Sequence, residues 1–114
     1  MQILKKEPTQ VNKGAGLCEV LNFENIEEIK NEMHNTLGDK LIHIAHPSVP
    51  GVLIVYSNAP GQQGNFRLSY SGEWIRGTVY FVASKRIDMT EEQIDAVRKS
   101  IKRFIITKEY LCTH

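Results

Sequence analysis

The chain has 114 residues, of which 41% are hydrophobic and 24% are charged. Its 14 basic and 13 acidic side chains leave a net charge of +1, so no overall electrostatic field would attract nucleic acid or anionic lipid. This length predicts a single domain, residues 1–114, and the hydrophobic content allows a core without disulfides or metals. Disordered, repeat and multidomain architectures are therefore excluded.

The first predicted elements are a strand and a helix. Leu17 to Leu21 is expected to form an opening strand, with Gln2 to Lys5 as a further candidate. The next segment combines apolar residues at helical spacing, a capping pair and a terminal glycine, which predict a helix from Asn25 to Leu37. The apolar residues are Ile26, Ile29, Met33 and Leu37, the capping pair is Asn25 and Glu28, and the glycine is Gly38.

Four runs rich in β-branched and aromatic residues follow, separated by turns that contain proline or glycine. Their short connections favour antiparallel hairpins, because a parallel crossover needs a dozen or more residues. The runs are Leu41 to Ala45, Val52 to Ser57, Phe66 to Tyr70 and Trp74 to Ala83.

The last predicted element is a helix that begins at a capping box formed by Thr90 and Gln93. Acidic side chains at its start and basic ones in its later turns match the helix dipole. The resulting order, ββαββββα, predicts an α+β fold: an antiparallel sheet of four to five strands with two helices packed on one face. The apolar face of this last helix contains Ile94, Val97, Ile101, Phe104 and Ile105.

Strand alternation predicts which side chains share a face of the sheet. Val52 to Tyr56 is apolar at every position, which is typical of a strand covered on both faces. Because two helices are expected to cover one face, the other face is predicted to be partly open to a ligand, a partner protein or a second copy. In the longest run, Ile75, Val79, Phe81 and Ala83 point to one side, and Trp74, Arg76, Thr78, Tyr80 and Val82 to the other.

No catalytic or metal-binding signature is present in the sequence. His43 and His46 are three residues apart in a strand context, so they are expected on opposite faces, and the Cys-x-x-Cys and His-Glu-x-x-His patterns are absent. Cys18 is predicted to be a small core residue, and Cys112 lies near the C-terminus. The serine-nucleophile and phosphate-loop fingerprints are missing as well. We therefore expect a protein that is not an enzyme and that uses no metal or cofactor.

The predicted open face and one polar loop form the candidate ligand site. Arginine side chains pair with phosphates, and aromatic rings stack on bases. The loop from Asn58 to Asn65 is long and rich in amides and glycine, as ligand-clamping loops are. Burial of Trp74 and Tyr80 in a homodimer interface is an equally good explanation of the same residues. The candidate ligand-binding residues are Arg67, Trp74, Arg76, Tyr80, Asn58, Gln62, Gln63 and Asn65.

A second candidate site is the basic last helix, which would bind nucleic acid. From Lys85 to Lys108 the chain has seven basic and four acidic residues, whereas from Leu17 to Asp39 it has one basic and six acidic residues. Cations near a helix C-terminus are also ordinary partners of the helix dipole, so this site is the alternative hypothesis. Its residues are Arg98, Lys99, Lys102 and Arg103.

Residues Ile26 to Ile94 resemble a family of small uncharacterised proteins that is common in bacteriophages and mobile elements. The most specific part is the strand Ile75-x-Gly77-Thr78-x-x-Phe81-Val82, followed by Thr90-x-Glu92-x-Ile94. The Asn58 to Asn65 loop and the long basic last helix depart from the family pattern. The family has no established activity to transfer, but the resemblance implies a small protein that acts by binding.

These observations together predict a non-enzymatic binding protein, encoded by a phage or mobile element and forming a homo-oligomer. It is expected to sequester a nucleotide-like signal or to block a host defence protein, and the alternative is a small nucleic-acid-binding regulator. Two cysteines are too few for a secreted disulfide framework, and MQILKKEPTQ lacks a signal-peptide apolar stretch. We therefore expect a cytoplasmic protein, in the host cytoplasm if phage encoded, that does not bind a membrane.

Overall fold

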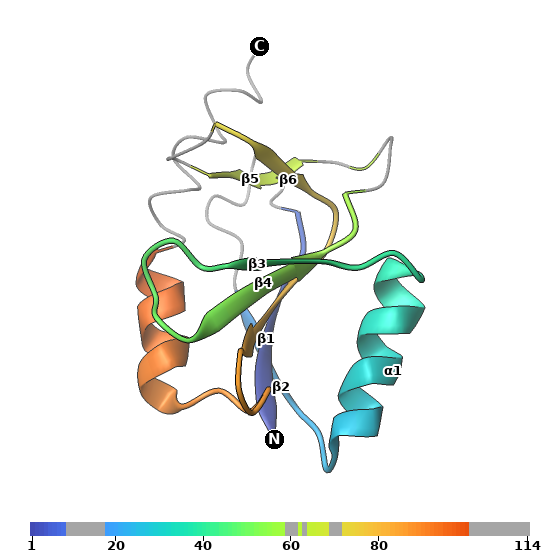
Figure 1. The fold of residues 1–114 in the computed structure, drawn as a ribbon, viewed down its shortest axis with the longest axis vertical. Helices are drawn as coiled ribbons and strands as arrows, with labels where there is room; N and C mark the ends of the chain where they lie inside the picture. Colours follow the sequence, from blue (N-terminus) through green and yellow to red (C-terminus); the bar gives the residue numbers. More distant parts are fainter. Residues whose placement is uncertain (9–17, 59–61, 63, 69–71, 101–114) are drawn as a thin grey trace.

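A computed structural model describes residues 1–8, 18–58, 62, 64–68 and 72–100 of the chain (Figure 1). Its main feature is a five-stranded sheet in the order β2-β1-β7-β4-β3, in which every neighbouring pair is antiparallel. A separate two-stranded sheet pairs β5 with β6, also antiparallel. The strands are β1 Gln2–Lys6, β2 Glu19–Asn22, β3 Ile42–Ala45, β4 Val52–Tyr56, β5 Gly64–Arg67, β6 Trp74–Arg76 and β7 Val79–Ala83.

Helix α1, Ile26–Leu37, forms where the capping residues predict it. The Asn25 side chain accepts a hydrogen bond from the Glu28 amide at 3.0 Å. Gly38 ends the helix at a φ of 86°, a conformation that favours glycine. The predicted boundaries, Asn25 to Leu37, are confirmed.

The second helix is described over residues 91–100, and its capping box also forms. The Gln93 amide donates to Thr90 Oγ1 at 3.1 Å, and the Thr90 amide donates to Gln93 Oε1 at 3.0 Å. Ile94 and Val97 are buried as predicted. Ile101, Phe104 and Ile105 lie outside the described residues. Neither helix, as far as the structure describes them, is long and apolar enough to cross a membrane.

The two helices lie on opposite faces of the large sheet, as Figure 1 shows, so the prediction that both pack on one face is wrong. Ile94 and Val97 of the second helix pack in one core cluster, whereas Ile29 and Met33 of α1 pack in another. The physical reason is that the central strands are apolar on both faces: all five residues of β7 are buried. One helix on each face removes both apolar surfaces from water.

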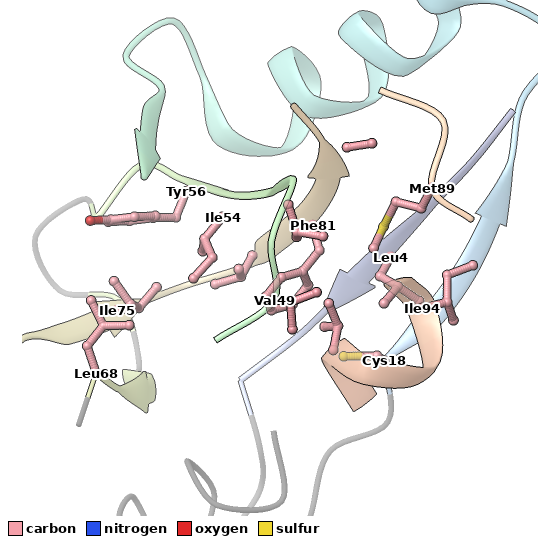
Figure 2. Close-up of a cluster of buried hydrophobic side chains, with 14 residues drawn as sticks. Leu4, Cys18, Val49, Ile54, Tyr56, Leu68, Ile75, Phe81, Met89 and Ile94 are labelled. Atoms are coloured by element: carbon pink, nitrogen blue, oxygen red, sulfur yellow. The ribbon is translucent and has the colours of Figure 1, made fainter. Parts of the chain in front are cut away.

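The larger core cluster connects the main sheet to the small sheet (Figure 2). It extends from Met89 and from Ile94 of the second helix to Ile75 of β6 and to Leu68, which follows β5. Because all four side chains are nearly inaccessible to water, the small sheet is packed on the same core as the large one.

The run Trp74 to Ala83 forms two strands rather than one, since Gly77 has a φ of 73° and interrupts it. The observed order, ββαβββββα, thus contains one more strand than predicted. The α+β class and the antiparallel sheet are confirmed. The alternation is confirmed too, because Val79 and Phe81 pack on the side of the second helix and Tyr80 and Val82 on the side of α1.

Candidate functional site

Helix α1 covers only part of its face of the sheet. Ile29 and Met33 are its buried residues, and they pack against a cluster that includes Ile3 of β1 and Tyr80 of β7. A helix with so narrow an apolar stripe cannot cover five strands that lie about 4.8 Å apart. The part of the sheet nearest β3 is therefore left without a helix above it.

An apolar groove lies there, between α1, the strands β3, β4 and β7, and the turn that follows β7. Its cavity has a volume of about 490 Å³, within the range of small-molecule sites. Aliphatic and thioether side chains form most of its surface, and polar groups stand among them. The apolar residues are Met33, Leu41, Leu53, Val55, Val82, Ala83 and Ile87, and the polar ones are Lys30, His34, His43 and Ser84.

Nitrogen-bearing side chains make the groove's polar part suitable for an anion. Lys30 projects from α1 as an exposed ammonium group. His43 lies on β3 opposite Val55, and His34 lies on α1 with its Nε2 at 3.2 Å from the Asp39 carboxylate. Since no carboxylate is among the described residues that line the groove, a ligand with an apolar body and one negative group would match its surface.

Ile87 shapes one wall of the groove from a strained backbone position. Its φ is 63°, in the left-handed region that a β-branched residue rarely adopts. The Ile87 amide donates to the Ala83 carbonyl at 2.9 Å, and the Ala83 amide donates back to Ile87 at 3.0 Å. This short bridge holds the strained residue, and its side chain packs against the core cluster that contains Val82.

A polar cluster attaches α1 to the sheet next to the groove. Glu32 of α1 accepts hydrogen bonds on one carboxylate oxygen from the Tyr80 hydroxyl at 2.6 Å and from Lys5 Nζ at 3.2 Å. Thr36 donates to the same oxygen at 3.3 Å. The bonds to Tyr80 and Lys5 attach α1 to β7 and β1.

The same contacts shift the pKa values of the cluster. The Tyr80 hydrogen bond, with further help from Lys5, lowers the pKa of Glu32 against the opposing effect of burial. Burial lowers the pKa of Lys5, but the Glu32 carboxylate outweighs it and the net shift is upward. Burial and the Glu32 bond raise the pKa of Tyr80. Each group is therefore held in its ordinary charge state, which suits a structural attachment rather than proton transfer.

The structure keeps Arg67, Trp74 and Arg76 in the small sheet and separates Tyr80 from them. Tyr80 is 0% exposed beneath α1, so the prediction that it stacks on a ligand from an open face is wrong. Trp74 and Arg76 belong to β6 of the small sheet, where Trp74 is half-buried and packs against Gly64 while Arg76 is exposed. Arg67 pairs with Trp74 through the backbone, and its side chain is outside the description. The break at Gly77 is the reason that Tyr80 lies in a different sheet from the other three.

The predicted loop residues have mainly structural contacts. Asn58 accepts a hydrogen bond from the Arg76 amide at 2.9 Å, and Gln62 packs against Gly77. Asn65 is 0% exposed, and its amide group donates to the carbonyls of Lys6 and Gly77 at 2.9 and 2.8 Å. Asn65 also accepts from the buried Lys6 ammonium, so the prediction that it contacts a ligand is wrong. Gln63 lies outside the described residues.

Two of the four predicted nucleic-acid residues are described. The Arg98 guanidinium donates to the Cys18 carbonyl at 2.9 Å, and Lys99 pairs with Asp95 at 2.9 Å. Lys102 and Arg103 lie outside the described residues, so the nucleic-acid hypothesis stays a prediction.

Cys18 is a buried core residue, as predicted. Burial raises the pKa of the Cys18 thiol to about 12, which keeps it protonated and unreactive. Among the residues that the structure describes, no group of three or more histidine, cysteine or acidic side chains could hold a metal ion. Cys112 lies outside the described residues.

A second, more polar cavity of about 700 Å³ lies beside the turn after β7 and the start of the second helix. Several polar groups around it already have partners within the chain. Asp88 accepts from the Gln2 amide at 2.8 Å, and Gln93 closes the capping box. This cavity therefore offers a ligand fewer unused polar groups than its size suggests.

Sequence reasoning chose the face of the sheet that holds the groove, the face of Tyr80 and Val82, but it missed the groove because it expected no helix there. The signal was present in α1, whose apolar stripe is too narrow for a five-stranded sheet, and in His43, which was considered as a metal ligand alone. Comparison of the chain with protein-family models, with curated proteins and with solved structures found no match. The resemblance to small phage and mobile-element proteins stays a prediction.

Proposed function

We propose that this protein acts by binding a small organic ligand with an apolar body and one anionic group in the groove beside α1. The observation that carries the proposal is the apolar cavity of about 490 Å³ with Lys30 and His43 in its lining. Burial of the ligand body against Leu53, Val55 and Val82 supplies the hydrophobic driving force. The Lys30 ammonium adds an attraction for the anionic group.

The sequestration of a nucleotide-like signal is a narrower version of this proposal, since a base has an apolar face and a phosphate is an anion. A groove of this volume accommodates a mononucleotide as well as a short aliphatic or aromatic carboxylate. Its largely aliphatic surface favours the carboxylates. The blocking of a host protein stays a prediction.

The test is a titration with 8-anilinonaphthalene-1-sulfonate, which has apolar rings and one sulfonate, followed by competition with octanoate, benzoate and a set of nucleotides. The dye should fluoresce on binding, and the Met33 methyl resonance should shift, because Met33 lines the groove. Lys30→Glu should weaken binding roughly two- to five-fold, the magnitude of an exposed charge contact.

Lys99→Glu is the matched control, because Lys99 is an exposed lysine on the opposite helix. It should leave dye binding unchanged. A Met33 resonance that does not move at saturating dye, or equal weakening by both lysine variants, contradicts the proposal.

A further inference from the structure

We propose that the free edge of β3 pairs with β3 of a second copy of this chain, antiparallel around a two-fold axis, to join two sheets into one. This inference does not depend on a ligand in the groove. β3 is the last strand in the sheet order and pairs with β4 alone in the described part of the chain. In Figure 1, β3 lies at the front of the sheet, and no other helix or strand is drawn in front of it.

The hydrogen-bond pattern shows which backbone groups of β3 point to the free edge. The His46 amide donates to the Val52 carbonyl at 2.8 Å, so residues 42, 44 and 46 form the pairs bonded to β4. His43 and Ala45 alternate with them and direct their amides and carbonyls outward. A second strand placed there would find donors and acceptors at the right spacing.

The side chains of β3 do nothing to prevent such pairing. Natural edge strands are usually protected by a lysine, a proline, a bulge or a covering element, and the sequence Ile42-His-Ile-Ala45 has no lysine, proline or bulge. The opposite edge differs, since β2 carries the exposed Glu19 carboxylate. In a symmetric pair, each strand faces the same side chains that it carries itself. Because β3 has no carboxylate or ammonium group, two copies of β3 can pair without like-charge repulsion.

The two-fold axis passes most favourably through His43. This register pairs His43 with the same residue of the second copy and keeps the outward-facing groups of both strands opposite each other. It also places Ile42, which is 39% exposed, against Ile44 of the second copy. The contact therefore removes one of the exposed large apolar side chains of the described surface from water.

The pairing would also extend the groove. A two-fold axis perpendicular to a sheet keeps equivalent helices on one face, so both α1 helices would stand on the same side. The two grooves, each with His43 in its lining, would then open toward one another across the paired strands.

Strands of four residues form a limited interface, and each hydrogen bond contributes about 0.5–1.5 kcal/mol net against the cost of association. We expect a dissociation constant of roughly 10–1000 µM. The test is sedimentation velocity of the full chain from about 10 µM to about 1 mM. The mass should rise with concentration from 13.0 kDa toward twice that value.

Two proline variants make the test specific to this edge. Ala45→Pro removes an outward amide from β3 without touching its bonds to β4, and it should abolish the dimer. Asn22→Pro removes an outward amide from β2, the opposite edge, and should leave the dimer intact. A chain that is monomeric throughout, a dimer that survives Ala45→Pro, or one lost equally in both variants overturns the proposal.

Circular dichroism establishes whether each proline variant is folded. If the Ala45→Pro variant is not folded, amide exchange on the unmodified chain tests whether two copies pair through β3. The His43 and Ala45 amides should exchange more slowly at about 1 mM than at about 10 µM. Equal exchange rates at the two concentrations overturn the proposal as well.

Discussion

His46 should make the stability of this protein fall at mildly acidic pH. It is 6% exposed, and its Nδ1 accepts hydrogen bonds from the amides of Ser48 and Val49, both at 3.1 Å. Its Nε2 therefore carries the proton and faces Ser100 Oγ at 3.1 Å, which itself donates to the Val97 carbonyl. A second proton on the ring would have to displace both amide bonds at Nδ1.

Burial lowers the pKa of His46 from its ordinary value of 6.5 to about 4. The unfolded chain thus binds this proton more readily than the folded chain, so the stabilisation is present above pH 6.5 and is lost as the pH falls toward 4. Linkage gives a loss of about 2 kcal/mol between about pH 7.5 and pH 5, and about 3 kcal/mol once the pH is below both values.

The assay compares urea unfolding of the unmodified chain with that of His46→Asn at several pH values. An asparagine carbonyl can still accept the amides two and three residues ahead, so the variant keeps the turn and loses the titration. The free energy of unfolding of the unmodified chain should fall by about 2 kcal/mol more than that of the variant over this pH interval. Carboxylates titrate in both proteins and cancel in the comparison. Parallel pH profiles would refute the reasoning.

Three further predictions concern the core and the groove. Tyr80→Phe should lower the free energy of unfolding by about 1–3 kcal/mol, because the Tyr80 hydroxyl donates to the Glu32 carboxylate. A urea midpoint equal within error to that of the unmodified chain would contradict this prediction. Iodoacetamide should alkylate Cys18 slowly in the native protein and quickly in urea, because Cys18 is 5% exposed and burial raises the pKa of its thiol. Peptide mapping measures the labelling, and rapid labelling of the native protein would contradict the burial of Cys18. In urea unfolding, the Ile87→Gly variant should be more stable than the Ile87→Ala variant by about 1 kcal/mol, because a φ of 63° strains any residue with a Cβ. A more stable Ile87→Ala variant would show that no strain is stored at this position.

The local elements follow from short-range rules that the sequence contains in full. Asn25, Glu28 and Gly38 define α1 because the capping groups satisfy the backbone of the helix ends next to them. Strand alternation in Val79–Ala83 follows in the same way from backbone geometry. Such features depend on neighbours within a few residues, which is why they could be predicted without a structure.

The candidate site depended on contacts between segments far apart in the chain. Tyr80 looked like a surface residue because its strand alternates, but Glu32, 48 positions away, meets its hydroxyl from α1. Trp74 and Tyr80 share a predicted face, and the positive φ of Gly77 separates them into different sheets.

The sequence alone thus determined the helices, most of the strands and the composition of each face, because these arise from backbone geometry and local hydrogen bonding. The tertiary structure decided which face each helix covers, because burial is a property of two surfaces that meet and not of either segment alone. The groove beside α1 follows from that decision, because a helix with two buried side chains, Ile29 and Met33, removes only part of a five-stranded sheet from water. The open edge of β3 follows from the strand order, which is also a property of the tertiary structure.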